Sequence, residues 1–223
     1  MTILKATEIP TLERAADAPM LAQVERWAAV NSGTGNLAGL KTVAGLLADA
    51  FAALPGDVRL VPADPVESVD SAGTVNTIQR GDHLHVRVRP DAPVQLLLTG
   101  HMDTVFAADH PFQTLKWLEE GVLNGPGTAD MKAGISVILA ALTALEASPL
   151  ASRIGYDVMI NSDEETGSQA SARLIAELAK GKTAALTYEP ALPDGTLAGA
   201  RPGSGNFSVI VHGRAAHAGR NPQ

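Results

Sequence analysis

The 223-residue sequence has no cysteine and few aromatic residues, which make up only 4% of the chain. Without cysteine it cannot build a disulfide framework, a thiolate zinc site or a cysteine nucleophile. Because aromatic residues are scarce, we expect a core of alanine, valine, leucine and isoleucine. Acidic side chains outnumber basic ones by 24 to 17, which gives a net charge of −7. This excess argues against nucleic acid or an anionic membrane surface as the main partner.

Long apolar runs and targeting signals are also missing. The longest nearly apolar stretch, residues 133–142, is shorter than the roughly 20 residues that span a bilayer. The first ten residues lack the basic start and apolar run of a secretory signal. Hydrophobic residues make up 45% and charged residues 18%, which is typical of a globular protein. We therefore expect a cytoplasmic protein with no membrane partner.

The hydrophobic pattern predicts strands that alternate with helices. We expect helices at residues 12–30, 37–53, 132–147 and 168–180, and strands at 58–61, 94–99, 154–160, 184–187 and 207–212. We also expect a loop at 62–73, and then a hairpin that pairs 74–79 with 84–88. Continuous apolar strands are typical of parallel sheets buried on both faces. The pattern therefore predicts an α/β fold, with a largely parallel sheet and helices on both faces.

Carboxylates and a histidine follow three of these predicted strands. His101 and Asp103 follow the first, Glu164 and Glu165 the second, and Glu189 the third, while Asp130 precedes the predicted helix at 132. Ligands of α/β sheets bind beyond the carboxyl ends of the strands. We therefore expect these side chains to gather at one edge of the sheet.

Each of these residues also has a plainer interpretation. The alternatives are a histidine that caps a strand end, an N-cap aspartate, a solvated acidic turn and an ordinary loop glutamate. The adjacent pair Glu164 and Glu165 is the most informative, because two neighbouring carboxylates repel each other unless a positive group compensates. A metal ion would compensate, with one glutamate as a ligand and the other as a general base. Lys132 could serve such a site or simply begin its helix, and His217 could contact substrate or be a plain loop histidine.

Four motifs occur in order along the chain: Gly100-His-Met-Asp-Thr-Val105, Gly125-Pro-Gly-Thr-Ala-Asp-Met-Lys132, Asp163-Glu-Glu-Thr-Gly-Ser168 and Tyr188-Glu-Pro190. Together they resemble the di-zinc metallohydrolase family that includes glutamate carboxypeptidase, acetylornithine deacetylase, succinyl-diaminopimelate desuccinylase and aminoacylase. The Glu189-Pro190 pair and residues 213–219 look most like the glutamate carboxypeptidase branch. The resemblance covers nearly the whole chain.

The resemblance implies a set of metal ligands. His101 and Glu189 would bind one zinc ion, Asp130 would bridge to the second, and Glu165 would bind the second. Two zinc ions per subunit are therefore implied for the full-length protein. Cobalt or manganese would also suit these donors, because sites of histidine and carboxylate accept several divalent ions.

The resemblance also implies catalytic roles. Glu164 would be the general base, and Asp103 would orient His101. His217 would reach the active site of a neighbouring subunit and steady the oxyanion there. The family further implies a cis peptide bond between Asp130 and Met131.

The resemblance implies a mixed sheet and a division into two domains. Residues 1–204 would form an incomplete catalytic, metal-binding domain, and residues 205–223 would begin an α+β lid domain through which two copies dimerise. The family's second zinc takes a further histidine from beyond residue 223. We therefore expect this stretch alone to hold an incomplete second site and to show little or no hydrolase activity.

The predicted function of the full-length protein is metal-dependent hydrolysis of an amide bond. The substrate would be a small molecule or short peptide with a free carboxylate. The alternative is a non-catalytic relative that binds metal or peptide, or that serves in dimerisation, and the intact Glu164 argues against it. A serine hydrolase is disfavoured because residues 202–205 lack the first glycine of Gly-x-Ser-x-Gly. A dinucleotide-binding enzyme is disfavoured because no Gly-x-Gly-x-x-Gly follows a strand.

Overall fold

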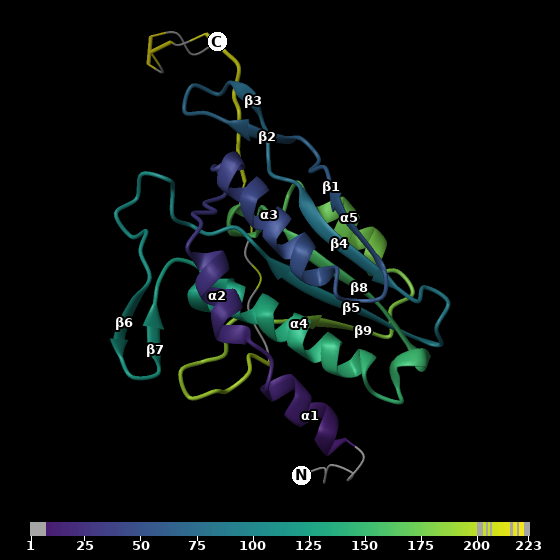
Figure 1. Cartoon of the computed structure of the whole chain (residues 1–223). Helices are drawn as coiled ribbons and strands as arrows, with labels where there is room; N and C mark the ends of the chain where they lie inside the picture. The colour runs from purple at the N-terminus through teal and green to yellow at the C-terminus, as the bar shows by residue number, and fades with distance from the viewer. Residues whose placement is uncertain are drawn as a thin grey trace.

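The computed structural model describes residues 8–199, 203, 205, 207–214, 216–217 and 219–220 (Figure 1). Its centre is a five-stranded sheet in the order β1-β4-β8-β5-β9. These strands are β1 (Asp57–Val61), β4 (His83–Val88), β5 (Val94–His101), β8 (Ile154–Asn161) and β9 (Ala184–Thr187). The strands β8, β5 and β9 run parallel, whereas β4 is antiparallel to both β1 and β8. The sheet is therefore mixed, and it is parallel in the half that carries the candidate site.

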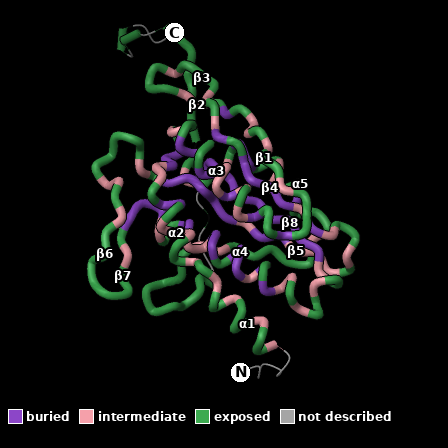
Figure 2. The backbone as a smooth tube through the Cα atoms, in the orientation of Figure 1, coloured by how far each residue is buried: buried purple, intermediate pink, exposed green. Residues whose placement is uncertain are grey.

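Helices cover both faces of the sheet, as predicted (Figure 1). The helices α2 (Met20–Ala28), α3 (Leu37–Phe51) and α4 (Ala133–Glu146) share one hydrophobic core with the sheet, and α5 (Ala172–Leu178) packs on the other face. A first helix, α1 (Ile9–Ala16), has no buried residue and lies against α4. Figure 2 shows that burial is concentrated in the central strands and in the helix sides that face them.

The main core is built mostly from aliphatic side chains, as the scarcity of aromatic residues predicted, although Trp27, Phe51 and Tyr156 are also buried in it. Leu47 of α3, Ile138 of α4 and Val158 of β8 are all completely buried there. The smaller core on the other face consists of Leu97, Met159 and Leu178. Residues that alternate along β5 and β8 therefore face different cores, which is why both strands have apolar residues at neighbouring positions.

The stretch Thr128–Glu146 is long and apolar enough to cross a membrane by length and composition alone, with 19 residues and a mean hydropathy of 1.4. Half of the most apolar 18-residue segment of this stretch is buried inside the fold. Most of the stretch is α4, whose buried residues include Ile135 and Leu142 in the main core. The apolar composition of α4 is thus explained by its place under the sheet.

Two predictions about the first 90 residues are wrong. The helix expected at 12–30 is two helices, because Pro19 stands directly before α2 and has no N–H to continue the first helix. The expected hairpin does not form either. Strand β3 (Val75–Ile78) pairs with β2 (Val66–Val69), which lies in the segment predicted as a loop. Strand β4 instead pairs with β1 and β8, as its nearly complete burial requires of a central strand.

Three further elements differ from expectation. The hairpin of β6 (Lys116–Glu119) and β7 (Val122–Asn124) is short and mostly exposed, so it has no core pattern that would reveal it. Helix α5 begins four residues later than predicted, because a turn with positive φ at Gly167 and Ser168 precedes it. The described residues 207–214 have no regular secondary structure, so the strand expected at 207–212 is not seen. A strand needs a neighbour for its N–H and C=O groups, and no described residue pairs with this segment.

Candidate metal centre

The candidate site lies where the three parallel strands end. His101 is the last residue of β5, and Glu189 follows β9 by two residues. Strand β8 ends at Asn161 and leads into the 3₁₀ turn Glu164–Thr166. Because parallel strands end at the same edge of a sheet, these residues converge as the sequence predicted.

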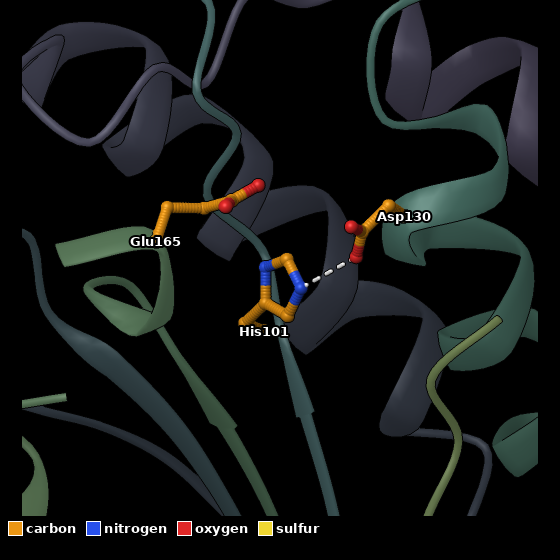
Figure 3. A group of neighbouring side chains, drawn as sticks. All are labelled: His101, Asp130 and Glu165. Carbon is orange, nitrogen blue, oxygen red and sulfur yellow. Dashed lines mark hydrogen bonds and ion pairs between the residues drawn. The ribbon is translucent and has the colours of Figure 1, made fainter. Parts of the chain in front are cut away.

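Three side chains come close enough to hold one metal ion. One ligand atom from each of His101, Asp130 and Glu165 lies within 4.8 Å of the others (Figure 3). Nε2 of His101 is 2.9 Å from Oδ1 of Asp130 and 3.7 Å from Oε2 of Glu189. In Figure 3 the carboxylates of Asp130 and Glu165 flank the imidazole ring. The histidine is buried and the carboxylates are partly exposed, so the group opens to solvent on one side.

The turn that carries Asp130 is not an ordinary helix start. Residues Thr128–Lys132 form a kinked turn after Gly127, whose φ is +71°. Asp130 has extended backbone angles there, and the Asp130–Met131 peptide bond is cis, as the family resemblance implied. Helix α4 begins only at Ala133, with Lys132 in the N-cap position. The plainer interpretation of Asp130 as an N-cap is therefore wrong, and its side chain is free to face His101.

Asp103 is fully buried, and its carboxylate anchors the turn that bears the two glutamates. Its Oδ1 accepts the backbone N–H of Glu164 and its Oδ2 accepts that of Glu165, both at 3.2 Å. The hydroxyl of Thr34 donates a further bond of 2.8 Å to Oδ2. Nδ1 of His101 lies 3.0 Å from the backbone carbonyl of Asp103 and 3.4 Å from its carboxylate. Asp103 therefore contacts His101 mainly through its backbone, while its carboxylate holds the glutamate turn.

The electrostatics of the site reflect crowded negative charge. Burial and the charges of neighbouring carboxylates raise the pKa of Glu165 to about 7, although the nearby His101 opposes this. Burial also raises the pKa of Glu164, with contributions from Glu189, Asp103 and Asp130. For His101, burial disfavours the charged ring, but Asp103 and Glu189 outweigh it and raise its pKa to about 11. The carboxylates thus favour a positive charge at the position of the imidazole.

The structure does not bring His217 to this group. Its side chain is exposed, and its Nδ1 accepts the backbone N–H of Gly219 at 3.1 Å. Its expected place, in the site of a neighbouring copy, stays a prediction. The other predicted residues lie together, including Glu164, whose pKa responds to the charges of His101 and Glu189.

The loop at residues 31–36 also supports the site, although its sequence has only the pattern of a turn and did not predict this role. The hydroxyl of Ser32 donates to the carbonyl of Met102 at 2.7 Å, and Thr34 holds Asp103. Gly33 forms a β-bridge with Thr104. A Cβ on Gly33 would lie 2.2 Å from a backbone oxygen, so only glycine allows this close approach. The cluster of small polar residues signalled a turn, but nothing in it indicated that the turn supports His101 and Asp103.

Comparison with known proteins gives a family and several relatives. The family described as peptidase family M20/M25/M40 matches residues 97–219, which is more than half of the chain. Carboxypeptidase G2 from Pseudomonas sp. (strain RS-16) is 35% identical over 148 residues, or 64% of this chain and 35% of its own length. Succinyl-diaminopimelate desuccinylase from Wolbachia pipientis wMel is 28% identical over 137 residues, or 55% of this chain and 33% of its own length. The chain thus spans about a third of the length of the curated relatives it matches.

A solved structure supports the fold independently. The crystal structure of human carnosine dipeptidase 1 matches with a TM-score of 0.63 and 17% sequence identity. The match covers 82% of this chain and 40% of the dipeptidase chain. The mixed sheet with helices on both faces is therefore a fold shared with a solved structure of low sequence identity.

Proposed function

Because the chain belongs to peptidase family M20/M25/M40, we propose that the whole protein is a metal-dependent hydrolase that cleaves an amide bond. The observation that carries the proposal is the convergence of His101, Asp130 and Glu165 at the ends of parallel strands. A buried imidazole flanked by two carboxylates, with burial raising the pKa of Glu165 to about 7, is an environment that a dication would stabilise. The likeness to carboxypeptidase G2 adds support for a C-terminal peptide bond or an N-acyl amino acid as the substrate.

The residues present fit divalent ions of the zinc type. Imidazole and carboxylate donors suit zinc, and they accept cobalt and manganese as well. We propose that His101 and Glu189 hold one ion, that Glu165 holds a second, and that Asp130 lies between the two. When bound, such ions would acidify a water molecule and polarise the substrate carbonyl.

The proposed mechanism assigns the proton transfers to Glu164. Its carboxylate would take a proton from the attacking water and later deliver it to the nitrogen of the leaving amine. The two adjacent glutamates would thus have different roles, one towards the ions and one towards the substrate. Asp103 holds both residues in a single turn, because its carboxylate accepts both of their backbone N–H groups.

The finer features of the whole protein are proposals as well. We propose that residues 1–204 belong to the catalytic domain and that residues 205–223 begin a lid through which two copies form a homodimer. His217 would then serve the neighbouring copy by stabilising the oxyanion. The proposed substrate is small and carries a free carboxylate, and the proposed compartment is the cytoplasm.

The test is a paired measurement of metal content and turnover. The protein expressed from its complete reading frame should bind zinc and should hydrolyse members of a panel of dipeptides and N-acyl amino acids. Removal of metal by a chelator should abolish turnover, and added zinc, cobalt or manganese should restore it. Tight metal binding without turnover of any substrate would instead favour the non-catalytic relative. Hydrolysis that survives complete metal removal would contradict the proposal.

A further inference from the structure

Lys132 is a fully buried lysine beside the candidate metal centre that the proposed mechanism does not use. It lies two residues after Asp130 and is 1% exposed. Lysine is almost never fully buried unless it is paired. Among the described residues its ammonium forms no ion pair and contacts neutral oxygens instead, with Oγ of Ser32 at 2.8 Å and the carbonyl of Val30 at 3.4 Å. Burying a cation on neutral acceptors is costly, so this position requires an explanation beyond helix formation.

Ser32 connects this lysine to the segment that carries His101. Its hydroxyl accepts the bond from Lys132 and donates its own proton to the carbonyl of Met102 at 2.7 Å. Its carbonyl accepts the N–H of Thr104 at 3.0 Å. Met102 stands directly between His101 and Asp103. A continuous chain of hydrogen bonds therefore runs from the Asp130 turn to the end of β5, and we call Lys132, Ser32 and the Met102 carbonyl the lysine strap.

The packing around the strap leaves little room for it to move. A Cβ on Gly127 would lie 3.2 Å from Nζ of Lys132 and 2.9 Å from a methyl carbon of Thr104. On the other side, the side chain of Met131 is completely buried, and its sulfur lies 3.2 Å from the backbone N–H of His101. Lys132 is thus enclosed between the loop at Gly127, which precedes Asp130, and the segment that follows the end of β5.

We propose that Lys132 is a positioning residue that sets the distance between His101 and Asp130 by holding Ser32 against the carbonyl of Met102. The inference rests on the proposed function, in which these two side chains bind the same metal centre. A lysine at this place can hold the segment of residues 30–32 at two points, the carbonyl of Val30 and the hydroxyl of Ser32, because its ammonium carries three donors. A residue of the same size without the ammonium would fill the space but would break the connection that runs through Ser32 to the carbonyl of Met102.

The test measures the zinc affinity of the protein expressed from its complete reading frame, by competition with a chromophoric chelator and with the zinc ion alone as the probe. Lys132→Met and Ser32→Ala should each weaken zinc binding, by about 10- to 100-fold, as is typical when a residue that orients a ligand is removed. The double variant should lose no more than Lys132→Met alone, because both substitutions break the same connection. If Lys132→Met does not fold, Ser32→Ala decides the question, since it removes only a hydroxyl group.

Two control variants separate positioning from general stability. Lys182→Met removes another largely buried lysine, one that bonds to Asp157, and Ser136→Ala removes a buried hydroxyl that donates to Gln23 at 2.6 Å. Both should lower the melting temperature and leave zinc affinity unchanged. If the strap variants also melt earlier but bind zinc as tightly as the wild type, Lys132 is only structural and the inference is wrong. If the wild type itself binds no zinc, the proposed function is wrong, and this inference is then wrong as well because it depends on the metal centre.

Discussion

Asp103 and Glu165 are joined by a hydrogen bond of 3.2 Å from the backbone N–H of Glu165 to Oδ2 of the aspartate. The other oxygen of the same carboxylate accepts the N–H of Glu164. Asp103 itself is fully buried at the end of β5, in the segment that also bears His101. One carboxylate therefore ties the β5 end to the turn after β8, so that the histidine and both glutamates share a single support.

This support predicts that Asp103→Ala weakens metal binding although no ligand is removed. The turn would lose two hydrogen bonds to a charged group, and Glu165 would no longer be held towards His101. We expect zinc affinity to fall about 10- to 100-fold in a chelator competition. Asp70→Ala is the matched control, because Asp70 also accepts backbone N–H groups of a turn, at Ala72 and Thr74, but in the distant β2–β3 hairpin. Equal losses of affinity in the two variants would contradict the prediction.

Substitutions should distinguish the proposed roles of the two adjacent glutamates. Glu164→Gln keeps the shape of the side chain but cannot accept a proton, so turnover should be abolished while metal content is retained. Glu165→Gln should instead lower metal content, because a neutral amide is a poorer ligand than a carboxylate. Metal analysis and hydrolysis assays on the protein from its complete reading frame check both outcomes. The reverse pattern would mean that the two roles are exchanged.

Much of this site could be predicted because its residues follow apolar strands in the sequence. The runs at 94–99, 154–160 and 184–187 are rich in apolar residues, which indicates strands buried in a parallel sheet. Once these strands are parallel, the residues that follow them must meet at one edge. The convergence of His101 and Glu165 is thus a consequence of local patterns and one rule of sheet geometry.

The remaining features depend on partners that a local pattern does not specify. Alternation at 75–78 predicted a strand correctly but not its pairing with β2 instead of β4. The loop at 31–36 supports the site through contacts with residues about seventy positions away, such as Ser32 with Met102. The lysine strap also depends on contacts between residues that are far apart in the sequence, such as Lys132 with Ser32. Small polar residues in a turn have the same appearance whether they face water or support a metal centre.

The close approach of α4 to the end of β9 predicts a contrast between two glycines. A Cβ on Gly134 would lie 2.1 Å from the backbone oxygen of Tyr188, whereas one on Gly45 in α3 would meet nothing within 4 Å. Gly134→Ala should therefore push the helix away from the strand and destabilise the protein by about 1–3 kcal/mol. Gly45→Ala should stabilise it by about 0.5–1 kcal/mol, because alanine favours the helix. Urea unfolding of both variants measures these changes, and a neutral Gly134→Ala would show that the helix and strand can separate at no cost.

Asp157 predicts how stability depends on pH. It lies on β8 within a buried cluster, 2.6 Å from His85 and 2.8 Å from Arg87, and it also pairs with Lys182. Burial opposes its charge, but the bonds to these three partners outweigh burial and hold its pKa well below the usual range. The unfolded chain has an aspartate pKa of about 3.9. The stabilisation by Asp157 is therefore complete above that value, and it is lost as the pH falls towards the lower pKa of the folded state.

Asp157→Asn should accordingly destabilise the protein at pH 7, by about 3–5 kcal/mol, because it leaves the largely buried Lys182 and the partly exposed Arg87 without their counter-charge. The difference in the free energy of unfolding between wild type and variant should become smaller below pH 4, because the wild type then loses the stabilisation by the charged Asp157. Urea unfolding at pH 7 and pH 3 tests both statements. Asp64→Asn is the matched control, since Asp64 makes two bonds of 2.8 Å to Arg173 on the exposed surface, where solvent weakens ion pairs. It should change stability far less at either pH, and a gap between wild type and Asp157→Asn that stays constant with pH would show that the charge of Asp157 does not stabilise the fold.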